Sequence, residues 1–270
     1  MVVQHNMAAS NANRQLGIST NVLSKSTEKL SSGYRINRAA DDAAGLSISE
    51  KMRSQIRGLN KASSNAQDGI SAIQTAEGAL NEAHSILQRM NELATQAAND
   101  TNTTVDRNAI QSEINALTSE VSRIASTTQF NTQNLLDGTF SSKNLQVGAL
   151  NGQKIAIDID TMNAAALSVN ALCVSTFAEA GKAMSAVQKA IEKVSKQRSS
   201  LGALQNRLEH TVNNLDNVAE NTQTAESRIR DTDMASEMVQ YSATSIIQQA
   251  GQSMLAQANS QTQGVLSLIQ

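Results

Sequence analysis

The chain has 270 residues, with 22 Lys and Arg against 24 Asp and Glu, no Trp, no Pro and only 2% aromatic residues. A net charge of −2 argues against a nucleic-acid binder, because neutralising phosphates requires a basic surface. So few large side chains suit slender helices that meet along narrow seams better than a thick globular core. The composition therefore favours a fibrous or assembling protein.

Apolar residues recur at every seventh position in two distant parts of the chain, as in long helices wound against a partner. The first row is Met52, Leu59, Ala66, Ile73, Leu80, Leu87 and Ala94, and the second is Val187, Val194, Leu201, Leu208, Leu215, Thr222 and Ile229. Between them, Ile110, Ile114, Leu117, Val121 and Ile124 keep four-three spacing. We predict a mainly α fold: an elongated antiparallel helical bundle, or coiled-coil rod, with long helices over residues 46–98 and 180–229.

The two ends of the chain have opposite charge and are both amphipathic. Residues 1–40 hold five Lys and Arg against one Glu, a sum of +4, and residues 231–270 hold three acidic residues and no Lys or Arg. Leu16, Leu23 and Leu30 mark an apolar face in the first segment, and Met238, Ile246, Met254, Leu255, Val265 and Leu268 mark one in the last. Two such helices would pair only weakly alone, so we expect both ends to be mobile in the monomer and to become ordered in an assembly.

Residues 31–45 connect the first helical segment to the rod. Asp41 or Asp42 suits the N-cap of the long helix. Alternatively, these two carboxylates pair with Arg35 and Arg38 in contacts between subunits. The polar run at 99–104 ends the rod helix, and Thr104 is a candidate cap for the next helix.

A short β region is predicted between the helices. Apolar residues alternate through 144–160 on either side of Asn151-Gly152, which predicts a β-hairpin. Residues 161–178 form a connector of small residues. Gly58, Gly69 and Gly78 lie inside the predicted rod helix, where glycine is unfavourable, and indicate either close approach of a neighbouring backbone or a helix stabilised mainly by its packing.

No pattern in the sequence indicates catalysis, so we expect no enzyme, no cofactor and no metal. A single Cys173 excludes an intramolecular disulfide and a Cys-based metal cage, and the three His residues are far apart in sequence. No secretory signal peptide or membrane-length apolar run is visible, which alone indicates a soluble cytoplasmic protein without a membrane partner.

Many ordered sequence blocks resemble bacterial flagellin, the subunit of the flagellar filament. They include LSSGYRIN at 30–37, DDAAG at 41–45, QTAEGALNE at 74–82, LQRMNELATQAAND at 87–100, TQFN at 128–131, NLLDG at 134–138, LGALQNRL at 201–208, ESRIRDTDMASE at 226–237 and QQAGQSMLAQAN at 248–259. The resemblance covers nearly the whole chain except about residues 140–180, where the family usually carries outer domains.

This resemblance implies a filament subunit that is exported through the flagellar apparatus, without a cleavable signal peptide, to an extracellular location. Expected partners are further copies of the chain, an export chaperone at the C-terminal segment, the filament cap and hook-junction proteins. The residues expected to serve filament assembly are Leu16, Leu23, Leu30, Arg35, Asp41, Asp42, Ile246, Met254, Leu255 and Leu266. The resemblance implies that the helices of segments 1–43 and 230–270 pair as an inner coiled coil of the filament and that segments 44–178 and 179–229 form the rod.

The resemblance also implies recognition by the host innate immune receptor Toll-like receptor 5. The positions that match the recognised patch are Gln88, Arg89, Leu93 and Glu113, whereas Asn91 and Thr95 depart from the best-known activating pattern. Alternatives are a hook–filament junction protein, which resembles flagellin at its ends, and a secreted helical binding module outside the flagellum.

Overall fold

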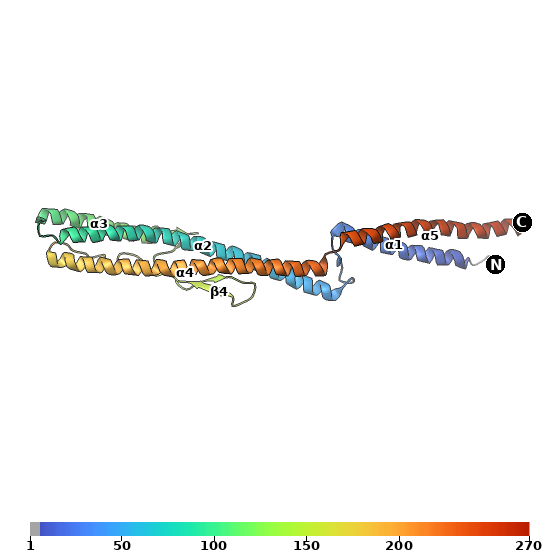
Figure 1. The fold of residues 1–270 in the computed structure, drawn as a ribbon, viewed down its shortest axis with the longest axis horizontal. Coiled ribbons are helices and arrows are strands. Elements are labelled where there is room, and N and C mark those ends of the chain that lie inside the picture. Colours follow the sequence, from blue (N-terminus) through green and yellow to red (C-terminus); the bar gives the residue numbers. More distant parts are fainter. Residues whose placement is uncertain (1–5, 270) are drawn as a thin grey trace. The chain divides into compact units, whose positions relative to one another are not determined.

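The computed structural model describes residues 6–269, with side chains described as far as residue 261. The helices are α1 (Met7–Ser32), α2 (Ala43–Ala97), α3 (Thr104–Thr127), α4 (Phe177–Arg230) and α5 (Met234–Ile269). The strands are β1 (Gln129–Phe130), β2 (Gln133–Asn134), β3 (Lys143–Gln146) and β4 (Lys154–Ile157). The predicted mainly helical fold is confirmed, with α2 and α4 at 55 and 54 residues (Figure 1).

The chain forms two compact units. The bundle unit is Gln55–Glu220, and the terminal unit consists of the parts of the chain up to Ser54 and from Asn221 onward. Helices α2 and α4 each have residues in both units. The segment boundaries expected from the sequence at residues 43/44, 178/179 and 229/230 stay predictions.

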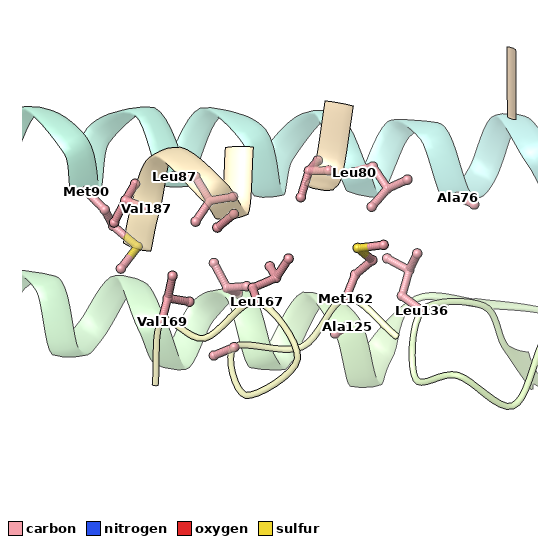
Figure 2. Packing of buried hydrophobic residues seen from close by; sticks show 14 of the residues in the cluster. Ala76, Leu80, Leu87, Met90, Ala125, Leu136, Met162, Leu167, Val169 and Val187 are labelled. Carbon is pink, nitrogen blue, oxygen red and sulfur yellow. The ribbon is translucent and has the colours of Figure 1, made fainter. Parts of the chain in front are cut away.

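The core of the bundle unit is built from the predicted heptad positions. In α2 they run from Leu59 to Ala94 and in α4 from Val187 to Leu215, and all are buried. Figure 2 shows Leu80, Leu87 and Met90 of α2 facing residues of the connector between β4 and α4. That connector adds buried residues Met162, Leu167 and Val169, with Ala125 of α3 behind them. Burial of these side chains is the main favourable contribution to folding of the unit.

The connector does not form a helix before Phe177. Asn163 Oδ1 accepts a hydrogen bond from the Ala166 N–H at 2.7 Å, and Gln197 of α4 donates to the Asp158 carbonyl at 3.0 Å. Small residues here allow the chain to lie against α3 and α4 while side chains satisfy its backbone groups. The connector is therefore part of the core.

The predicted hairpin is present as the antiparallel pair β3–β4. Leu145 pairs with Ile155, and Asn151-Gly152 lies in the loop, where Gly152 adopts a φ of 87°. Ile155 and Ile157 are buried, as their alternation predicts. A second pair, β1–β2, was not predicted; its two-residue strands flank Asn131 and Thr132, both at positive φ.

Neighbouring segments approach two of the three glycines at positions 58, 69 and 78 of α2. A Cβ at Gly58 would lie 2.8 Å from the Ala149 Cβ and 3.3 Å from the Ala149 Cα in the hairpin loop, and one at Gly69 would collide with the side chain of Leu145 in β3. Nothing lies within 4 Å of the corresponding position at Gly78. The expected approach of a neighbouring backbone is therefore correct for Gly58, whereas a side chain approaches Gly69 and no segment approaches Gly78.

The helix caps follow the sequence closely. Asp42 accepts a hydrogen bond from the Gly45 N–H at 2.8 Å, which satisfies a free donor at the start of α2. Thr103, not Thr104, caps α3: it forms a capping box with Asp106. The Thr103 hydroxyl and N–H both donate to the Asp106 carboxylate and lower its pKa.

Candidate functional site

In the terminal unit, α1 and α5 lie side by side in antiparallel orientation (Figure 1). Asn6 Nδ2 donates to the Ala258 carbonyl at 2.9 Å near one end, and Lys29 Nζ lies 3.5 Å from Glu237 Oε2 near the other. Between them, Gln248 Nε2 donates to Thr20 Oγ1 at 3.3 Å. The predicted pairing of the terminal helices is therefore confirmed.

The seam between α1 and α5 contains small and polar side chains. Ser26 and Thr244 are buried, and Leu16 packs beside Gly251, where its Cδ1 would be in ordinary van der Waals contact, at 3.5 Å, with an added Cβ. Leu23 and Leu30 are only half-buried. Because hydrophobic stabilisation scales with the apolar area removed from water, this seam stabilises the pair weakly.

The opposite charges of the two ends are used only in part for pairing. Among the described residues, Lys29–Glu237 is the ion pair that joins residues 1–40 to residues 231–270. Asp233 caps α5 by accepting from the Ala235 N–H at 3.0 Å, and Asp231 accepts from the Ser227 hydroxyl at 2.7 Å. Two of the three acidic residues of the tail therefore serve local structure.

Large apolar side chains of α5 lie outside the seam and face solvent. Their exposed fractions are Met234 46%, Met238 50%, Val239 71%, Ile246 66%, Ile247 58% and Met254 65%. We call these six residues the α5 apolar face. Solvent-exposed apolar side chains gathered along one helix indicate a surface that a partner covers. Met234, Val239 and Ile247 were missed from the sequence, although polar residues at 237, 244 and 248 mark the opposite, inward face.

The residues predicted for filament assembly fall into different environments. Ile246 and Met254 belong to the α5 apolar face, whereas Leu16, Leu23, Leu30 and Leu255 are half-buried. The side chain of Leu266 lies outside the described residues. An assembly role for these residues stays a prediction, and Ile246 and Met254 are the ones whose side chains are free to meet another subunit.

The four charged residues of the connecting segment have partners within the chain. Arg38 Nε lies 3.0 Å from Glu28 Oε1, and Arg35 donates to the Ile229 carbonyl. Asp41 accepts from the N–H groups of Arg38 and Asn37, which lowers its pKa. Within the described part of the chain, Asp41 and Asp42 form no ion pair with Arg35 or Arg38, and the N-cap interpretation applies to Asp42. Contacts of these residues between subunits stay a prediction.

Arg230, which the sequence analysis did not single out, ties this segment to α2 and α4. Its Nη1 donates to Glu50 Oε1 at 2.7 Å, its guanidinium lies 4.8 Å from the centre of the Tyr34 ring, and its carbonyl accepts from the Arg35 N–H at 2.7 Å. The hydrogen bond from Arg230 lowers the pKa of Glu50. The sequence could have indicated Arg230, because basic residues near the C-terminus of a helix often interact with its last turn.

The proposed receptor residues lie in the bundle unit, where Arg89 bridges two helices. Its Nε lies 3.1 Å from Glu113 Oε1 on α3 and its Nη1 lies 3.1 Å from Glu92 Oε2 on α2. The two carboxylates raise the pKa of the Arg89 guanidinium, and the hydrogen bond to Glu92 is the largest single cause, followed by the hydrogen bond to Glu113. All three side chains are at least 45% exposed, so their charges face solvent.

The other two predicted receptor positions differ in exposure. Gln88 is exposed, and its Nε2 lies 3.1 Å from His84 Nε2. Leu93 is only 2% exposed and belongs to the hydrophobic core of the bundle unit. Arg89, Gln88 and Glu113 are therefore available to a partner at the surface, whereas the Leu93 side chain is enclosed.

In the part of the chain that the structure describes, no cluster of three or more His, Cys, Asp and Glu side chains could hold a metal ion. None of the described helices is long and apolar enough to cross a membrane. Long helices, narrow seams and an exposed apolar face instead define the class of helical structural proteins that polymerise.

Comparison with known proteins identifies the family. The chain matches the bacterial flagellin N-terminal helical region over residues 3–141 and the C-terminal helical region over residues 184–269. It is 55% identical over 271 residues to a flagellin of Halalkalibacterium halodurans and 50% identical over 303 residues to one of Bacillus subtilis, covering 100% of each chain. The crystal structure of Bacillus cereus flagellin aligns at a TM-score of 0.50 and 30% identity, covering 56% of this chain and 88% of that one.

The chain belongs to the bacterial flagellin family. It is a structural, non-enzymatic protein and a subunit of the extracellular flagellar filament. The expectation of a cytoplasmic protein, drawn from the missing signal peptide, is therefore wrong, and the location implied by the resemblance is correct.

Proposed function

We propose that this flagellin polymerises mainly through the α5 apolar face, with the α1–α5 pair acting as the assembly element. The observation that carries the proposal is the exposure of Ile246, Ile247 and Met254 on a helix whose partner α1 contacts small and polar residues. Helix α1 packs on the opposite side of α5, so these side chains stay exposed to water in the single chain. Neighbouring subunits would cover them, and the gain from burying apolar surface would offset the ordering of the terminal helices.

Electron microscopy of seeded filament growth tests this proposal. The double substitution Ile246→Asn, Ile247→Asn should abolish or strongly slow polymerisation, because each Asn would have to lose its bound water in the subunit interface. Val105→Asn, at an equally exposed apolar position of α3, is the matched control and should leave growth near that of the parent. Normal filaments from the double variant would contradict the proposal.

The same apolar face is proposed as the binding site of the export chaperone before secretion. A chaperone that covers Met238, Ile246 and Met254 would keep an amphipathic helix from premature association. Ile246→Asn, Ile247→Asn should then also fail to retain the chaperone in a pull-down from the cytoplasm. The filament cap and the hook-junction proteins are proposed to contact the terminal helices in place of a neighbouring subunit.

A second proposed function is recognition by Toll-like receptor 5, through Arg89, Gln88 and Glu113. The observation that favours it is the exposed group of charges around Arg89, since an Arg held in one geometry by Glu92 and Glu113 is a pre-organised interface anchor. The enclosed side chain of Leu93 would contribute indirectly, by fixing the packing of α2 beneath the patch.

Binding of the full-length monomer to the receptor ectodomain tests this function. Arg89→Ala should weaken binding by at least about tenfold, in the range of an interface anchor. Arg123→Ala is the matched control, because Arg123 is also exposed and also pairs with a carboxylate one turn away, Glu120. Equal affinities of the Arg89 variant and the parent would contradict the assignment.

A further inference from the structure

A groove with a basic wall runs along the first half of α4. It has a volume of about 690 Å³ and lies between α4 and connector residues 166–168. Lys182, Lys189 and Lys193 line it, together with small side chains such as Gly181 and Ser185. No acidic or aromatic residue is among its lining residues. We call it the α4 lysine groove.

The three lysines lie on one side of the helix, seven and then four residues apart. At about 1.5 Å per residue, the Cα atoms of Lys182 and Lys189 lie about 10 Å apart along the helix axis, and Lys193 follows about 6 Å further on. Lys193 Nζ donates to the Ala166 carbonyl at 3.0 Å, so it bridges the two walls. The groove therefore presents positive charge along its length.

These ammonium groups differ from four of the six arginines of the same unit. Arg89, Arg107, Arg123 and Arg198 each lie within 4 Å of a carboxylate. Within the described part of the chain, no carboxylate lies within 4 Å of the ammonium groups of Lys182, Lys189 or Lys193. The charge of the groove is therefore not neutralised inside the subunit.

The acidic residues nearest in sequence do not change this. The Glu179 carboxylate accepts hydrogen bonds from the hydroxyls of Ser175 and Thr176, the latter at 3.2 Å, and lies outside the groove lining. Glu192 is exposed on α4 and is not a lining residue either. The groove lining itself therefore carries lysines and neutral side chains, whereas Glu179 lines the adjoining pocket that shares Lys182 with the groove.

We propose that the α4 lysine groove binds an anionic polysaccharide outside the cell. Three point charges spaced along a groove suit a linear polymer with repeated anionic groups, and the small side chains leave room for its backbone. The absence of aromatic lining residues disfavours single-stranded nucleic acid, which binds largely by stacking of bases. The subunit belongs to an extracellular filament, where anionic polysaccharides of cell surfaces are accessible.

The test measures binding of the full-length monomer to heparin, used as a sulfated polysaccharide probe, over a range of salt concentrations. The triple variant Lys182→Gln, Lys189→Gln, Lys193→Gln should lose about tenfold or more in affinity at low salt. The plot of log affinity against log salt should also become shallower, with the magnitude of its negative slope reduced by about 2, because three ionic contacts are removed.

A second triple variant controls for net charge. Lys51→Gln, Arg57→Gln, Lys61→Gln removes the same charge from exposed positions of α2 and should change the affinity by less than about twofold. Circular dichroism checks that both variants stay helical, and the single variants Lys182→Gln and Lys189→Gln replace a triple that does not fold.

Three results would overturn the proposal. The first is a parent protein that does not bind heparin at low salt. The second is an equal loss in both triple variants, which would assign binding to overall charge. The third is a groove variant that binds heparin like the parent but no longer polymerises, which would assign the groove to contact with a neighbouring subunit.

Discussion

The bundle unit and the terminal unit pack long helices in opposite ways. In the bundle unit the large apolar side chains point inward, and Ile73, Leu80 and Leu87 have no exposed surface. In the terminal unit the inward positions of α5 are Glu237, Thr244 and other polar or small residues, and the large side chains point outward. The bundle unit is therefore complete within one chain, whereas the terminal unit requires neighbours to cover its apolar surface.

This difference suits a subunit that has to exist as a monomer before it polymerises. A finished bundle keeps the subunit folded at any concentration. In the proposed assembly, the terminal helices gain further stabilisation when the apolar faces of several subunits meet, and this gain depends on the local concentration of subunits. The same chain thus separates folding from polymerisation.

The largest expected effect is on the free energy of unfolding, and it should differ between the two units when the same substitution, Leu to Ala, is made in each. Leu87→Ala should lower the free energy of unfolding by about 2–5 kcal/mol, because it leaves a cavity in a fully buried core. Leu23→Ala, at a half-buried position of α1, should cost less than about 1 kcal/mol. Denaturant unfolding of the monomer, followed by circular dichroism, measures both. Equal losses would show that the α1–α5 seam is as well packed as the bundle core.

A smaller effect tests how the hairpin packs on α2. Gly78→Ala should stabilise the protein by about 0.5–1 kcal/mol, because Ala favours the helix and nothing lies near its Cβ. Gly58→Ala has the same helix propensity gain, but its Cβ would lie 2.8 Å from the Ala149 Cβ and 3.3 Å from the Ala149 Cα. Overpacking costs about 1–3 kcal/mol, so thermal unfolding should place this variant at least about 1 kcal/mol below Gly78→Ala. Equal stabilities would mean that the hairpin loop moves away without cost.

The helices and their seams could be predicted because their signals are local and repeated. Each heptad row adds evidence at every turn, so the ends of α2 and α4 lie within about three residues of the expected positions. The strands β1 and β2 have two residues each, too few to show any alternation. Thr103 was identifiable, since Thr103 and Asp106 have the spacing of a capping box.

The candidate site was less predictable because its properties depend on which helix lies opposite. The burial of Leu93 could have been inferred, since it continues the four-three spacing of Ile86, Met90 and Ala97. The partners of Arg35 and Arg38 could not be inferred from the sequence. Ile229 is almost 200 residues from Arg35, and Glu28 lies on α1 whereas Arg38 lies in the non-helical segment that follows. Likewise, the outward direction of Ile246 and Ile247 follows from the position of α1, which no local pattern specifies.

The smallest expected effect concerns pH and the α3 cap within the bundle unit. The pKa of Asp106 is lowered from 3.8 in the folded protein by hydrogen bonds from Thr103. Its contribution to stability is therefore complete above the unfolded pKa and is lost as pH falls through the folded pKa. Asp106→Asn should be less stable than the parent at neutral pH, and the difference in thermal midpoint should shrink as the pH is lowered from about 5 to about 2. A difference that stays constant over this range would show that the cap stabilises through hydrogen bonding alone, whatever the charge of residue 106.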